Sequence, residues 1–168
     1  MEENSMRANV ICGLCVCLGV TLLLVSGVVF IQDRRFFTTA PKDIQARLED
    51  HRERFIGQHV LGYILAVIAI AVVIVSFACA VYDGIGKGYT FMDFFRRNMF
   101  ILLFYKAYDI IFFDWLLLTR THFFQHWYPE TEGCAGYRNF GFNRKEQIKE
   151  ILSFPLTAAI ISLIAIMF

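Results

Sequence analysis

Three ionisable side chains, Lys106, Asp109 and Asp114, lie within an otherwise uncharged stretch of 20 residues, 99–118. On a helix Lys106 and Asp109 share a face and can form an ion pair, and Asp114 lies on a neighbouring face. If the helix continues beyond this stretch, Arg120 returns to the side of the first pair. An ionisable group inside a membrane-spanning helix costs about 2.5–3.5 kcal/mol on insertion scales, so it usually faces protein or water. These four residues are candidates for handling an ion or a small solute. The alternative is a structural ion pair with an aspartate near the membrane surface.

Two histidines follow this stretch directly. His122 and His126 are four residues apart, so a helix would place both imidazoles on one face, where they could bind one metal ion. Glu130 and Glu132 are candidate further ligands, and imidazole with carboxylate suits a divalent ion such as Zn, Fe or Mn. The carboxylate base of a metalloprotease is missing, because a phenylalanine follows the first histidine and Gln125 precedes the second. The alternative is that this aromatic-rich segment belongs to the belt at a membrane surface.

Apolar helices must position these groups. Hydrophobic residues make up 57% of the 168 residues and charged residues only 18%, which is more apolar surface than one soluble core of this size buries. Each apolar run has about the 20 residues that a helix needs to cross a membrane, and lipid accepts only helices or closed barrels. The runs are 10–31, 60–82, 99–118 and 151–168.

The expected fold class is therefore all-α: a polytopic integral membrane protein with a four-helix transmembrane bundle in a single transmembrane domain, 1–168. The first run has an alternative interpretation as a cleaved signal peptide, which would leave three spans. Its length exceeds the roughly 7–15 residues of a signal core, and no A-x-A site follows it, so we expect a retained span.

Lysine and arginine are distributed unevenly between the connections. The two long loops, 33–58 and 119–150, contain eleven, whereas the opposite side has four. This bias predicts that the long loops are cytoplasmic and that both termini lie outside a cell membrane. The net charge of +1 gives no field that would favour nucleic acid. The expected partners are the lipid bilayer and either further copies of the chain or another membrane protein.

Helical signals also occur inside the long loops. Pro41 is typical of a helix start, and Ile44, Leu48, His51 and Phe55 recur at helical spacing after it. This pattern predicts a short amphipathic helix on the cytoplasmic membrane face.

A second helix start is predicted at the end of the second long loop. Asn143 with Glu146 three residues later reads as a capping box, from which a helix would run into the last span. Pro155 is expected to kink that helix or loosen one of its turns.

Three functional classes remain open, and so does the question whether the chain is an enzyme. The first, which the charged third span favours, is ion or small-solute transport, or an accessory subunit of a transporter. The second is a membrane-embedded enzyme, metal-dependent or not, that acts on lipid at the cytoplasmic face through His122, His126, Asp114 and Glu130. The third is a non-catalytic protein that binds another membrane protein.

Overall fold

Four long helices dominate the structure. The computed structural model describes residues 2–167, and every regular element in this part of the chain is helical. Two of the long helices, α1 and α4, continue as wider π-helical segments, η1 and η3, without leaving the helix axis. The bounds are Glu2–Val25 for α1, Ser26–Ile31 for η1, Gln58–Gly86 for α3, Phe91–Tyr108 for α4, Asp109–Arg120 for η3 and Arg144–Ala165 for α6.

Three of these helices are long and apolar enough to cross a membrane: Ser5–Ile31, Gln58–Gly86 and Arg144–Ala165. The first two contain the predicted runs 10–31 and 60–82, and the third contains the fourth run, 151–168, up to Ala165; residue 168 lies outside the described residues. The continuous helix from Phe91 to Arg120 is not among them, and it carries Lys106, Asp109 and Asp114 in its second half.

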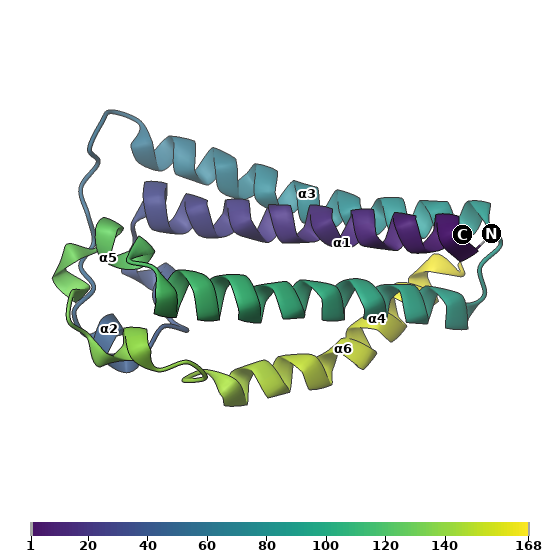
Figure 1. Ribbon diagram of the computed structural model, residues 1–168. Coiled ribbons are helices and arrows are strands. Elements are labelled where there is room, and N and C mark those ends of the chain that lie inside the picture. Colours follow the sequence, from purple (N-terminus) through teal and green to yellow (C-terminus); the bar gives the residue numbers. More distant parts are fainter. Residues whose placement is uncertain (1, 168) are drawn as a thin grey trace.

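The long helices follow one another across the molecule in the order α3, α1, α4, α6 (Figure 1). Helix α1 packs against both α3 and α4, and α6 packs against α4. Glycines allow α1 and α3 to approach closely, because a Cβ added at Gly19 would lie 2.7 Å from Val73 and one at Gly62 would lie 2.7 Å from Ile31. Between α4 and α6, the fully buried Asn98 donates a hydrogen bond to Ser162 (3.2 Å).

Both long connections lie at one end of the helices, and the two ends of the chain lie at the other (Figure 1). The connections pack on each other through buried side chains and form a small apolar core over the helix ends. Five short helices occur in them: η2 (Arg34–Phe37), α2 (Lys42–Gln45), α5 (Phe123–Trp127), η4 (Pro129–Thr131) and η5 (Ala135–Arg138). The buried residues of this core are Val28, Phe37, Ile44, Leu48, Leu118, Tyr128, Cys134 and Tyr137.

The amphipathic helix predicted after Pro41 is much shorter than its apolar pattern indicates. Helix α2 ends at Gln45, although Ile44 and Leu48 are buried as expected. Phe55 is 49% exposed. Beyond the helix, His51 donates its backbone N–H to the carbonyl of Gln32 (3.3 Å). This contact with the end of the first helix replaces a local helical hydrogen bond.

The third predicted span begins earlier in the structure than its apolar run. Helix α4 starts at Phe91 because Thr90 and Asp93 form a capping box, in which each side chain accepts from the other residue's backbone N–H (3.4 and 3.0 Å). The Thr-x-x-Asp spacing that signals this start is present in the sequence, but the prediction followed the apolar run, which begins at position 99.

Helix α6 begins at Arg144, as predicted, but not through the predicted capping box. The side chain of Asn143 makes no capping hydrogen bond and instead donates to Asp114 (3.5 Å). Pro155 lies inside α6, which bends along its length and is inclined to α4 (Figure 1).

Candidate functional site

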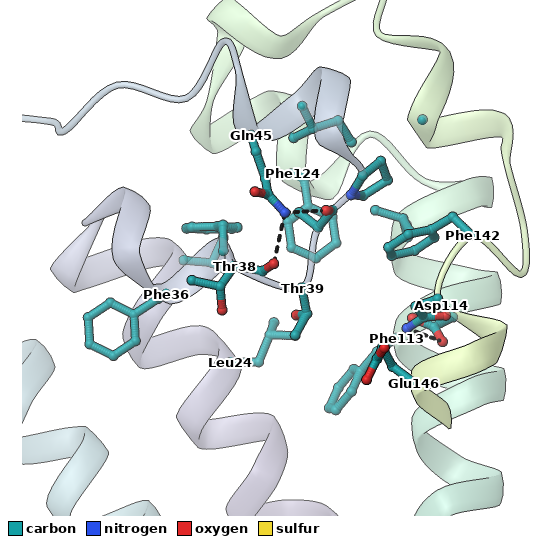
Figure 2. A pocket seen from close by; sticks show the side chains of 18 of the residues that line it. Leu24, Phe36, Thr38, Thr39, Gln45, Phe113, Asp114, Phe124, Phe142 and Glu146 are labelled. Atoms are coloured by element: carbon teal, nitrogen blue, oxygen red, sulfur yellow. Dashed lines mark hydrogen bonds between the residues drawn. The ribbon is translucent and has the colours of Figure 1, made fainter. Parts of the chain in front are cut away.

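A cavity of about 1360 Å³ lies where the long helices meet the two long connections. Its walls come from the second half of α1, from the end of α4 and η3, and from the first turns of α6 (Figure 2). The α1 side is apolar and includes Leu24, whereas Asp114 and Glu146 lie together on the opposite side (Figure 2). The site therefore has an apolar wall facing a charged one.

The charged wall contains the ion pair predicted on the third run. Lys106 is 4% exposed, and its Nζ lies 2.8 Å from Asp109 and 2.6 Å from Glu150 of α6. The predicted pair of Lys106 and Asp109 is thus present, and Glu150 is a second acceptor that the sequence analysis missed. The lysine charge is therefore neutralised by carboxylates within the protein.

Asp114 lies on the same wall but has a different environment. Its carboxylate accepts hydrogen bonds from the side-chain amides of Gln147 and Asn143. Among the described residues it has no ion-pair partner within 4 Å. The carbonyl oxygen of the Asn143 side chain is buried and has no hydrogen-bond partner in that part of the chain. This corner of the cavity therefore presents an unpaired carboxylate and an unused amide oxygen.

The first long connection forms the roof of the cavity. Gln45 donates from Nε2 to the carbonyls of Thr38 (2.8 Å) and Ala40 (2.6 Å), which folds the segment back on itself (Figure 2). Asp43 accepts a hydrogen bond from the backbone N–H of Gly136 (2.8 Å) and so joins the two connections. Gly136 is required there, because a Cβ would lie 2.5 Å from Asp43 and from Pro41.

Two tyrosines of the second long connection also line the cavity. Tyr137 shares a hydrogen bond with the hydroxyl of Thr131 (2.6 Å). Tyr128 is fully buried against Phe37, with ring centroids 4.8 Å apart, and its hydroxyl has no hydrogen-bond partner among the described residues. Burial raises the pKa of Tyr128 above its usual value, and the charge of nearby Glu130 acts in the same direction.

The four candidate metal ligands do not converge. His122 precedes the short α5, and His126 lies within it with its ring against Trp127. Both histidines and Glu132 are exposed, and no three His, Cys, Asp or Glu side chains in the described chain form a group that could hold a metal ion. The metal hypothesis is not supported by this geometry.

Glu130 instead belongs to a polar network that the sequence analysis missed. It accepts from or pairs with the ring of His51 (3.1 Å). Gln32, at φ +51°, contacts His51 (3.4 Å) and donates to the carbonyl of Trp127 (3.3 Å), and the fully buried Gln58 donates to Gln32 (3.2 Å). The network ties both connections to the ends of the first and second helices. Two glutamines flanking a charged loop are the only sequence signal that points to it.

Arg120 lies outside the lining of the cavity. Its guanidinium is exposed and sits over the ring of Trp115, 5.4 Å from the ring centre. The expected return to the side of Lys106 assumed α-helical spacing, whereas η3 is π-helical and has more residues in each turn.

A second buried charge lies near the opposite end of the helices. Arg97 is 3% exposed, and it donates to the carbonyl of Ala80 (2.6 Å), to Asp83 (2.8 Å) and to the hydroxyl of Tyr89 (3.0 Å). These contacts join α3, the turn after it and α4. Arg97 is one of the four basic residues counted on the side opposite the long loops. Spacing along the chain does not indicate its pairing with Asp83, which becomes its neighbour only when the two helices fold together.

The comparisons add no relative: no protein-family model, no curated protein and no solved structure matches this chain.

Proposed function

We propose that the chain crosses a cell membrane four times, with both long loops in the cytoplasm and both termini outside. The paired arrangement of the helix ends supports this, because both termini lie at one end and both loops at the other (Figure 1). The excess of lysine and arginine in the loops supports a cytoplasmic position for them. The helix from Phe91 to Arg120 is the remaining span, and the pairing of Lys106 with Asp109 and Glu150 makes its insertion less unfavourable.

The function we propose is the binding of a small amphipathic solute at the cytoplasmic membrane surface, as a carrier or as the solute-binding subunit of a transporter. One observation carries this proposal: a large cavity with an apolar wall on α1 and a charged wall on η3 and α6. Ligand sites are mostly apolar cavities with a few polar groups that orient the ligand. A solute with an apolar chain and a polar head matches both walls at once.

The placement of the candidate residues favours binding over catalysis. Of the four residues that the enzyme hypothesis used, Asp114 lines the cavity, whereas His122, His126 and Glu130 are not part of its lining. A second copy or another membrane protein remains the expected partner, since a bundle of four spans is small for a transporter.

Photolabelling tests the binding proposal directly. The purified protein in lipid nanodiscs is irradiated with a dodecanol that carries a diazirine, and the labelled peptides are identified by mass spectrometry. We expect labelling of the η3 and α1 peptides that border the cavity, and we expect excess unlabelled dodecanol to remove it. Leu24→Trp fills the apolar wall and should abolish this saturable labelling. Leu14→Trp, on an exposed part of the same helix, is the matched control and should leave it intact.

Uniform labelling of all lipid-facing helices, with no part that unlabelled dodecanol removes, would show that the cavity does not bind such a solute.

A further inference from the structure

The charge of the cavity lining indicates which head group it suits. Two lysines and five carboxylates line the cavity, so the formal balance is three negative charges. Among the described residues neither lysine forms an ion pair with Asp114, and Lys106 is held between Asp109 and Glu150. The lining residues with charge are Lys42, Asp43, Lys106, Asp109, Asp114, Glu146 and Glu150.

The remaining carboxylates differ in how far they are neutralised. Glu146 pairs with Lys149 (2.7 Å), but both side chains are about two-thirds exposed, at 67% and 70%, and such a pair is weak in water. Asp43 is engaged with the backbone of Gly136. Asp114 accepts only from amides among the described residues. Asp43 is exposed, whereas Asp114 is half-buried, so Asp114 is the half-buried carboxylate of the lining that has no ion-pair partner in the described part of the chain.

Two buried polar atoms on the same lining lack partners and point to a ligand independently of charge. They are the amide oxygen of Asn143 and the hydroxyl of the fully buried Tyr128. A buried polar group without a partner destabilises a protein by about 1–3 kcal/mol. A ligand that forms hydrogen bonds with these two atoms would remove this cost. The Asn143 amide oxygen, beside Asp114, can accept a hydrogen bond from a ligand, and the Tyr128 hydroxyl can donate one.

We infer that the cavity binds an amphipathic primary amine, with its ammonium group at Asp114 and Asn143. This inference rests on the proposed function. A primary ammonium carries three N–H donors and one positive charge, which matches a carboxylate and an amide oxygen. A quaternary ammonium has the charge without the donors, and an alcohol has a donor without the charge. The apolar chain then lies along the α1 wall, near Leu24.

This chemistry has two sources: an aminophospholipid of the bilayer or a free long-chain amine. Both carry a primary ammonium that is protonated at pH 7, as a lysine side chain is. The experiment separates them by varying the bilayer and the added amine independently.

Competition against the photoreactive dodecanol tests the inference. Dodecylamine, dodecyltrimethylammonium and unlabelled dodecanol are each titrated in phosphatidylcholine nanodiscs. We expect dodecylamine to displace the label at a concentration at least about tenfold lower than either of the others, since hydrogen bonds to charged groups contribute this much. Asp114→Asn keeps the shape and should remove the preference. Glu132→Gln, outside the lining, is the control and should retain it.

Asn143→Ala provides a second variant that leaves the Asp114 carboxylate in place. It should lower the preference for dodecylamine over dodecyltrimethylammonium severalfold, while gel filtration and circular dichroism verify the fold of each variant.

The source of the amine is tested by changing the bilayer lipid. If displacing the label takes a higher dodecylamine concentration in phosphatidylethanolamine nanodiscs than in phosphatidylcholine nanodiscs, this would support the inference and identify the bilayer lipid as the source. An unchanged requirement would support it with the free amine as the source, provided that the tenfold preference is present.

Dodecylamine acting no better than dodecanol or dodecyltrimethylammonium, with saturable labelling still present, would overturn the amine assignment and leave the proposed function standing. The absence of saturable labelling would overturn both.

Discussion

Replacing Lys106 by methionine should leave the carboxylates of Asp109 and Glu150 without their ion-pair partner and so destabilise the protein. The lysine Nζ contacts Asp109 at 2.8 Å and Glu150 at 2.6 Å, and its side chain is 4% exposed. Removing one partner of a buried ion pair destabilises a protein by about 3–5 kcal/mol. Glu150 is 44% exposed and can turn to water, whereas Asp109 is only 19% exposed. We therefore expect the lower end, about 3 kcal/mol, which is on the order of a hundredfold in the unfolding equilibrium.

Equilibrium unfolding in mixed detergent and SDS micelles, followed by circular dichroism, measures this effect. The matched control is Lys149→Met, which removes the ion pair between Lys149 and Glu146 of α6, whose side chains are 70% and 67% exposed. It should change stability by less than about 0.5 kcal/mol. Adding Asp109→Asn and Glu150→Gln to Lys106→Met should recover about half of the loss or more, because no unpaired carboxylate remains. A loss below 1 kcal/mol for Lys106→Met, or no recovery in the triple variant, would refute the reasoning.

Three further predictions concern the fold. Gly62→Ala should destabilise the protein by about 1–3 kcal/mol in the same assay, because the new Cβ would lie 2.7 Å from an isoleucine; Gly86→Ala, with no atom within 4 Å, should be nearly neutral, and equal effects would contradict the close approach. Thr90→Ala should lose about 1 kcal/mol, because its capping box with Asp93 disappears; an unchanged unfolding midpoint would argue against the cap. Burial raises the pKa of Tyr128, so the unfolded state loses its proton first and stability should fall as pH rises above about 10; Tyr128→Phe should reduce that fall, and an identical pH profile in the variant would exclude this tyrosine as its cause.

Local patterns predicted the long helices well and their ends poorly. The apolar runs 10–31, 60–82 and 151–168 each lie within, or extend just past, a long helix of the structure. An apolar run shows which part of the chain forms a long helix. The first and last residues of that helix depend on hydrogen bonds made beyond the run. Thr90 and Asp93 start α4 eight positions before the predicted span, and α2 ends at Gln45 although the apolar spacing continues to Phe55.

The helical class, the apolar runs, the uneven charge of the loops and the pairing of Lys106 with Asp109 can be predicted from the sequence, because they depend on composition or on neighbours within one helical turn. The candidate site depends on the packing of the helices and loops. Glu150 and Gln147 reach the third helix from α6, and Tyr128 reaches the cavity from the second long connection. The same folding leaves His122 and His126 exposed on a short helix. Contacts between residues tens of positions apart depend on how helices pack and loops fold back, and no spacing along the chain encodes that geometry.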